Sequence, residues 1–237
     1  SAFSCRPPFP ERAGRHRNEV RALRPYARPM AKPAPRIAFL AAARVVPDVV
    51  AAVADHWDDP SALDEWTVGG LAGHFARAVG TVGAYLAADP PSGGTVLDPA
   101  GYFLAARLDD DEVRSGILAR GDEMAAAGPE ALAVSVAETV DELTATIEAT
   151  PDDRLLAVFG GSILSLDDYL VTRLVELVVH HDDLAASVEE PLPPLPGEAV
   201  DLAVGTLQAM ARRIHGDRAV VRTLARSERA PGSIAVF

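Results

Sequence analysis

The sequence has little cysteine, few aromatic residues and no long hydrophobic run. Its one cysteine, Cys5, excludes an intramolecular disulfide and fits a reducing compartment. Aromatic residues make up 5% of the 237 residues although 49% are hydrophobic, so small aliphatic side chains dominate and favour closely packed helices. No apolar run reaches the about 18 residues that a membrane span needs, and the chain does not open on a signal-peptide pattern. We therefore expect a cytoplasmic protein with no membrane partner.

Charge is divided unevenly along the chain. Residues 1–36 contain nine Lys or Arg and two Glu, whereas the remainder contains 13 basic and 32 acidic residues. An acidic body argues against nucleic-acid binding by the folded part. The first 36 residues are rich in Pro and Arg and lack helical or strand periodicity, which predicts a disordered basic leader. Met30 precedes the first good hydrophobic segment and is an expected alternative start of translation.

Hydrophobic residues at helical spacing predict a mainly α-helical protein. The expected helices cover residues 37–56, 68–88, 109–149, 168–187 and 197–215. Pro47 predicts a kink or break in the first of them, and Thr67 is the expected N-cap of the second. The pair Gly128-Pro129 predicts an interruption of the third.

The segments between these helices are rich in Pro, Gly and acidic residues. Residues 89–108 are expected to form a loop, and residues 150–166 a short hairpin or an irregular loop. Asp167 or Asp168 is the expected cap of the helix that follows. Residues 189–196 read as a stiff Pro-rich linker. The last twenty residues predict a short helix and an extended end.

The helix expected at 168–187 carries its polar residues on one narrow stripe. On a wheel of about 100° per residue, that stripe comprises Tyr169, Arg173, Glu176, His180, Asp183 and Ser187. Most of the remaining circumference is apolar, so this helix is expected to be largely buried. The polar stripe then faces either solvent, with Arg173 paired to Glu176, or an internal polar site.

Glu176 and His180 lie four residues apart, which places a carboxylate and an imidazole one turn apart on the same face. Two histidines and a glutamate can bind Zn²⁺ and leave positions open for water or substrate. The same ligands suit non-haem Fe²⁺, so ligand chemistry alone does not choose the metal. The third ligand would come from another helix, and His74 is the best candidate, although its place at the margin of an apolar stripe is also typical of a hydrogen-bonded core histidine. Asp183 is either a solvated residue or one that orients a ligand or acts as a base.

Two motifs about a hundred residues apart resemble a known family. Trp66-Thr-Val-Gly-Gly-Leu-Ala-Gly-His74 is similar to the W-(T/S)-V-x-x-L-x-x-H segment of the DinB-like superfamily. Arg173-Leu-Val-Glu-Leu-Val-Val-His-His-Asp-Asp-Leu184 is similar to the R-x-x-E-x-x-x-H-x-x-D-L segment of its mycothiol-dependent maleylpyruvate isomerase branch. The resemblance covers roughly residues 37–190. It implies a DinB-like four-helix bundle with a short α(+β) C-terminal extension, and divides the chain into 1–36, 37–190 and 191–237.

The same resemblance implies metal ligation by His74, Glu176 and His180, with Zn²⁺ as the expected ion, and mycothiol as cosubstrate. After Cys5 the chain has no cysteine, so any thiol chemistry uses a thiol brought from outside. A divalent metal binds such a sulfur and holds it as thiolate. Addition to an activated alkene, rotation and elimination would isomerise a small electrophile, whereas retention of the adduct would be transfer. Arg173 is a candidate for binding a substrate carboxylate or orienting Glu176.

Three hypotheses follow. The first is a metal- and mycothiol-dependent transferase or isomerase. The second is a non-catalytic metal-binding member that acts as a stress-linked or interaction protein, and the third is a metal-free bundle whose polar stripe faces water. A homodimer through an exposed helix face fits any of the three on general frequency.

Overall fold

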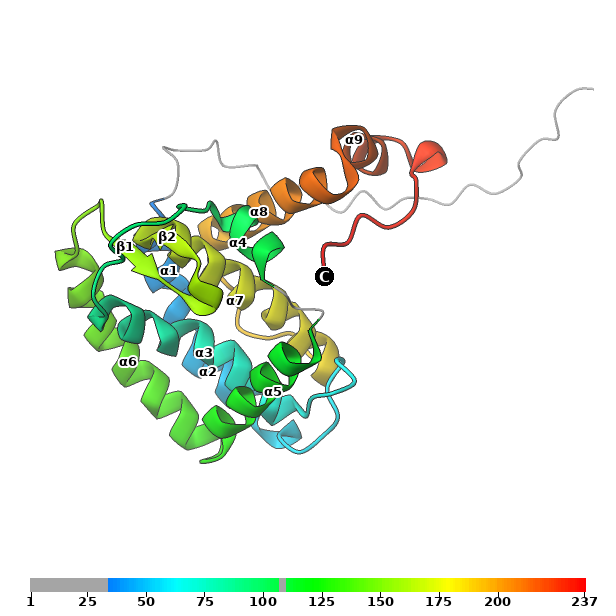
Figure 1. The fold of residues 1–237 in the computed structure, drawn as a ribbon. Coiled ribbons are helices and arrows are strands. Elements are labelled where there is room, and N and C mark those ends of the chain that lie inside the picture. The colour runs from blue at the N-terminus through cyan, green and yellow to red at the C-terminus, as the bar shows by residue number, and fades with distance from the viewer. Residues whose placement is uncertain (1–33, 107–109) are drawn as a thin grey trace, which may run out of the picture. The chain divides into compact units, whose positions relative to one another are not determined.

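The computed structural model describes residues 34–106 and 110–237, and Cys5, His16 and Met30 therefore lie outside the described part, with most of the expected leader. Figure 1 shows a mainly helical fold with one small sheet, which confirms the predicted fold class. The helices are α1 (Pro35–Ala43), α2 (Val46–Ala52), α3 (Val68–Ala87), α4 (Pro99–Ala105), α5 (Asp111–Ala125), α6 (Pro129–Ala149), α7 (Leu166–Val188), α8 (Gly197–His215) and α9 (Asp217–Ala225). Short 3₁₀ turns lie at Ala54–His56, Phe159–Gly161 and Ser227–Arg229.

Local sequence signals account for several of the helix ends. The first hydrophobic segment is broken between α1 and α2, and Pro47 lies in the first turn of α2. Proline is tolerated there because the first N–H groups of a helix have no hydrogen-bond partner within the helix. Thr67 caps α3 by accepting a hydrogen bond from the N–H of Gly70, as its position predicts. Pro129 begins α6 directly after Gly128, which has a positive φ of 87°. The break near Pro47, the Thr67 cap and the interruption at Gly128-Pro129 are therefore confirmed.

The core lies between four helical segments, namely α1–α2, α3, α6 and α7, with α5 packed along the outside of α3 (Figure 1). Leu, Val and Ala fill most of it, as the composition indicates. Its largest fully buried side chains are Tyr169, Phe39, Phe75, Leu71, Ile147, Leu156, Leu164, Leu166, Leu170, Leu174, Leu177 and Leu184. Removal of this apolar surface from water is the main source of the free energy that stabilises the packing of α3 against α7.

Helices α3 and α5 approach each other through glycines. A Cβ on Gly73 would lie 2.2 Å from the carbonyl oxygen of Gly121, and a Cβ on Gly121 would lie 2.4 Å from the ring of Trp66. No real side chain tolerates such distances, so this contact requires glycine at both positions. The close approach also leaves room for Trp66 beside the N-terminal half of α3.

The small β component is a hairpin between α6 and α7. Strand β1 (Leu155–Ala157) pairs antiparallel with β2 (Ile163–Ser165), and the turn contains Gly160 and Gly161 with φ values of 71° and 74°. Of the two alternatives for residues 150–166, the hairpin is therefore confirmed.

Two expectations for the connecting segments are wrong. The α7 cap is Ser165, whose Oγ accepts from the N–H of Asp168, so the expected caps Asp167 and Asp168 instead occupy the first turn. Residues 89–108 are not wholly a loop, because α4 forms within them. Asp98 caps α4 through Gly101, and a Pro at the first helical position pre-sets the backbone.

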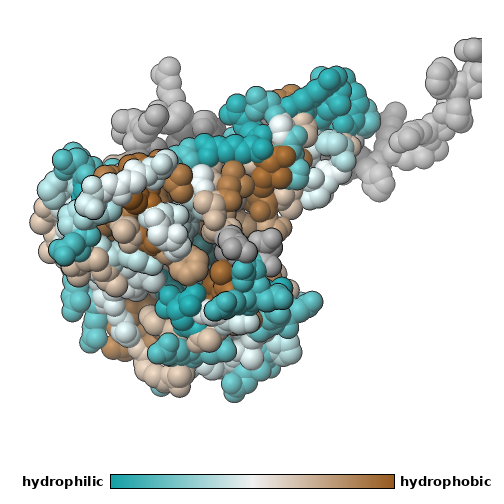
Figure 2. Space-filling view, in the orientation of Figure 1, coloured by the Kyte–Doolittle hydropathy of each residue, from teal (hydrophilic) through white to brown (hydrophobic). Residues whose placement is uncertain are grey.

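Beyond the linker, α8 packs against α7 and adds Ala199, Ala203 and Met210 to the buried core. The helix stops at Gly216, as predicted, and α9 follows. Hydrophobic side chains stay exposed on this part of the chain, among them Val204, Val221 and Leu224, and Figure 2 shows a brown patch beneath α8. None of the helices in the described ranges is long and apolar enough to cross a membrane. The expected division at residue 190 and the homodimer stay predictions.

Candidate metal centre

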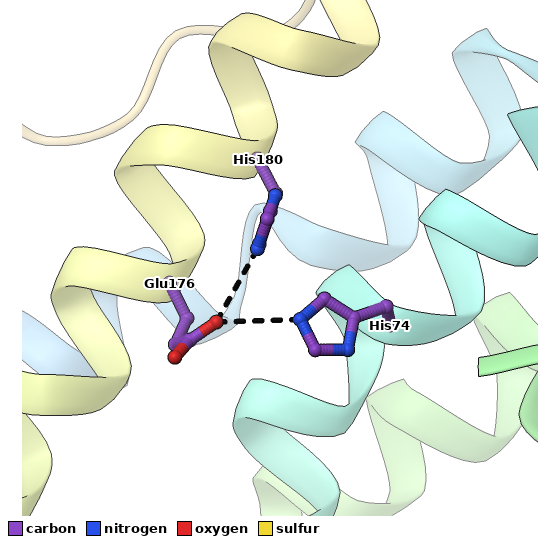
Figure 3. A group of neighbouring side chains, drawn as sticks. All are labelled: His74, Glu176 and His180. Atoms are coloured by element: carbon purple, nitrogen blue, oxygen red, sulfur yellow. Dashed lines mark ion pairs between the residues drawn. The ribbon is translucent and has the colours of Figure 1, made fainter. Parts of the chain in front are cut away.

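Two helices bring three candidate ligands to one point. His74 projects from α3, and Glu176 and His180 project from α7, one turn apart (Figure 3). The Nε2 atoms of both histidines lie 3.3 Å from the same oxygen, Oε2 of Glu176. The three side chains are 17–20% exposed, so the cluster is largely but not wholly shielded from water. The structure thus brings together the three residues that the sequence singled out.

The spacing of these atoms suits a small divalent ion. Ligand atoms at about 2.0–2.1 Å from a tetrahedral Zn²⁺ lie roughly 3.3 Å apart. The two distances to Glu176 match that value, and all three ligand atoms lie within 4.8 Å of one another. A hydrogen bond between charged partners would be shorter, at about 2.7–2.9 Å. The donor set and its spacing therefore fit an ion bound by two imidazoles and a carboxylate.

Asp183 fixes the position of a proton on the candidate ligand His180. Nδ1 of His180 donates to Oδ2 of Asp183 at 2.9 Å, one turn further along α7. Burial opposes a charged imidazole, but the hydrogen bond to Asp183 and the nearby negative charge of Glu176 outweigh it and raise the pKa of His180 to about 9. Without a metal, His180 is therefore an imidazolium between two carboxylates. An ion held at Nε2 would take the place of the proton there, while the Nδ1–H of His180 stays hydrogen-bonded to Asp183.

Glu176 remains ionised because Arg173 and the two histidines surround it. Burial alone would raise the pKa of Glu176, but the two histidines and Arg173 outweigh burial and hold that pKa well below its usual range. The guanidinium of Arg173 lies 3.7 Å from Oε1, the oxygen turned away from the histidines. It also stacks over the ring of Tyr169 with 5.0 Å between the guanidinium carbon and the ring centroid. Arg173 thus lies where it can orient Glu176.

His74 has a different surrounding from His180. Burial lowers the pKa of His74 below its usual value despite the nearby carboxylate of Glu176, so this imidazole is neutral. Its ring packs against Trp66, with 5.2 Å between the ring centroids. Nδ1 is buried and has no hydrogen-bond partner among the described residues. Ligation through Nε2 would place the proton on that Nδ1, so the fit of His74 rests on its distance to Glu176 and not on a supporting hydrogen bond.

The other histidines of the described residues lie apart from this cluster. His56 pairs with Asp59, three residues further on. His181 contacts the carbonyl of Pro193 through Nε2, and His215 contacts the carbonyl of Ala235.

A pocket of about 290 Å³ opens beside the cluster on the Arg173 side. Its lining comprises His74, Arg77, Ala78, Thr81, Tyr85, Tyr102, Phe103, Ala106, Ile117, Arg120, Phe159, Tyr169, Arg173 and Glu176. Two of the three clustered side chains therefore reach a cavity large enough for a small molecule.

Sequence reasoning missed most of this lining. Arg77 and Thr81 follow His74 by three and seven residues, so helical spacing on α3 was a signal that both share its face. Tyr102 comes from α4, which the Asp98-Pro cap pattern could have revealed. The hydroxyl of Tyr169 lies 2.9 Å from Thr81, and burial raises the pKa of Tyr169 to about 12. The hydroxyl of Tyr169 therefore stays neutral at physiological pH.

Fold and site together define a helical-bundle protein with a candidate metal centre at the edge of a pocket. A family model described as mycothiol maleylpyruvate isomerase N-terminal domain matches residues 39–185, which include all three candidate ligands. The chain belongs to this DinB-like family. Neither the curated proteins nor the solved structures contain a match to the chain.

Proposed function

We propose that this protein is a metal-dependent enzyme that uses mycothiol to attack a small electrophile, as an S-transferase or an isomerase. The observation that carries the proposal is the convergence of His74, Glu176 and His180 on one point beside a pocket of about 290 Å³. Family membership supports mycothiol as the thiol. The absence of cysteine after Cys5 supports a thiol that comes from outside.

His74, Glu176 and His180 would hold the ion, and Zn²⁺ is the proposed one because it favours imidazole and carboxylate ligands. When bound, a divalent ion of this kind stabilises a coordinated thiol as its thiolate at neutral pH. Asp183 keeps the imidazole of His180 in the tautomer that presents Nε2. Arg173 holds Oε1 of Glu176 and leaves Oε2 facing the histidines.

The pocket would receive the electrophile. Tyr102 and Phe103 of α4 form one part of its wall and are 8% and 6% exposed, which limits access of bulk water. A dry wall protects a reactive thiolate and its adduct from side reactions. Elimination of the thiol after rotation would return an isomer, and protonation of the adduct would complete a transfer.

The test is thiol consumption by the purified protein. Mycothiol loss should be measured with a panel of activated alkenes, with metal and after chelator treatment, for the wild type and His180→Ala. The proposal predicts turnover that requires metal and disappears in His180→Ala. His56→Ala is the matched control, because His56 lies in a 3₁₀ turn and, among the residues that the structure describes, pairs only with Asp59.

Two other results are informative. Thiol consumption that survives in His180→Ala would remove the proposed site. Metal binding without thiol binding or turnover would instead favour a non-catalytic, metal-binding member of the family.

A further inference from the structure

Two arginines of the pocket have no anionic partner in the described part of the chain. Arg77 of α3 and Arg120 of α5 both line the cavity and are half-buried. Neither side chain forms a hydrogen bond or an ion pair within the described residues, and the only aromatic contact is that of Arg120, which lies 5.8 Å from the ring centroid of Phe159. The other arginines that form ion pairs do so with carboxylates outside this cavity, except Arg173.

The pocket therefore carries an excess of positive charge. Its lining contains three arginines and a single carboxylate, that of Glu176, which Arg173 and the two histidines already surround. Burial lowers the pKa of Arg77, and the charges of Arg120 and Arg173 lower it further. Cations that repel one another in a partly desolvated cavity cost free energy that a bound anion would recover.

The position of these arginines relative to the candidate ligands matters for function. Arg77 follows His74 by three residues on α3, so the two side chains leave the helix on the same face, less than one turn apart. One cavity is thus lined by two candidate metal ligands and by two guanidinium groups that find no partner in the described ranges. A guanidinium presents parallel N–H donors that match the two oxygens of a carboxylate or phosphate.

We propose that Arg77 and Arg120 form an oxyanion-binding subsite, and that the electrophile of this enzyme carries a carboxylate or phosphate group which these two arginines hold. The identification of the ligand as the electrophile rests on the proposed function. The anion site itself does not, because it depends only on charge and geometry within the pocket.

The first experiment measures anion binding to the full chain. Succinate, methyl phosphate and uncharged succinamide should be titrated by calorimetry, with the melting temperature recorded alongside. We expect one of the two anions to bind saturably and to raise the melting temperature, and succinamide to do neither. The better of the two anions identifies the group as carboxylate or phosphate.

Variants locate the binding. Arg77→Gln and Arg120→Gln should each weaken anion binding about tenfold to a hundredfold, the effect of losing hydrogen bonds to a charged group. Arg77→Lys and Arg120→Lys should give intermediate affinity, since charge is kept and the bidentate geometry is lost. Arg114→Gln is the control on α5, because Arg114 is exposed and pairs with Glu65 and Asp111. It should bind as the wild type does.

Chelator-treated protein separates this subsite from direct binding of the anion to a metal. Affinity that is equal in the wild type and in all four pocket variants would overturn the proposal, as would equal binding of succinamide. Anion binding that disappears with the metal but not with the arginines would do the same. If the arginine variants lose anion binding while the wild type consumes no thiol, the subsite is supported and the proposed function is wrong.

Where turnover is found, Arg77→Gln should lower kcat/KM for an anionic electrophile about tenfold or more. The kcat/KM for the neutral methyl ester of the same electrophile should not change.

Discussion

Nδ1 of His180 donates a hydrogen bond to Oδ2 of Asp183 at 2.9 Å, and this pair turns Nε2 of the imidazole toward Glu176. Both residues lie on α7 and are themselves one turn apart, so helix geometry alone sets their relationship. The orientation of the candidate ligand His180 is therefore built into a single element. It does not depend on how α3 and α7 pack.

Replacement of Asp183 should weaken metal binding without abolishing the fold. Asp183→Ala removes the carboxylate that fixes the His180 tautomer, and loss of such a partner typically costs tenfold to a hundredfold in metal affinity. Competition with a chromophoric chelator measures this change. Asp182→Ala is the matched control, because Asp182 is the exposed neighbour. Equal losses in the two variants would argue against the role given to Asp183.

The metal-free protein should lose stability as pH rises through the raised pKa of His180. The pKa of about 9 exceeds the ordinary value of 6.5, so the folded state binds the proton more tightly than the unfolded state does. The resulting contribution is complete below pH 6.5 and is lost as pH rises through about 9. Urea unfolding of chelator-treated protein between pH 6 and 9.5 should show this decline, and His180→Gln should reduce it. A decline of the same size in His180→Gln would show that another group is responsible.

The glycine contact between α3 and α5 should tolerate no added methyl group. Gly73→Ala places a Cβ 2.2 Å from the carbonyl of Gly121 and should cost about 1–3 kcal/mol of unfolding free energy through forced backbone shifts. Gly80→Ala, on the same helix, meets only the flexible end of Met124 at 3.4 Å and should be neutral or stabilise by up to about 1 kcal/mol. Urea denaturation of both variants tests the contrast. Similar stabilities would refute the close packing.

The sequence predicted the polar stripe of α7 well because all of its members lie on one helix. Glu176, His180 and Asp183 follow from a period of 3.6 residues and need no tertiary information. His74 was harder, because its partner helix lies a hundred residues away and spacing says nothing about which faces meet. The motif resemblance supplied that link.

The pocket could not be predicted from periodicity alone. Tyr102 comes from a short helix within a Pro- and Gly-rich segment, where the expected loop obscured the Asp98 cap. Arg120 depends on the packing of α5 against α3, which Gly73 and Gly121 permit. The cap of α7 was assigned wrongly for a simpler reason, since Ser165 and Asp168 are both good capping residues and only the backbone conformation distinguishes them.

The proposed metal site can be tested by elemental analysis of protein purified without a nickel column, with the wild type beside His180→Ala and His56→Ala. We expect about one divalent metal per chain in the wild type and in His56→Ala, and its loss in His180→Ala. If the wild type holds no metal even after incubation with Zn²⁺ and desalting, the proposed metal site is wrong, and His74, Glu176 and His180 form only a buried polar cluster.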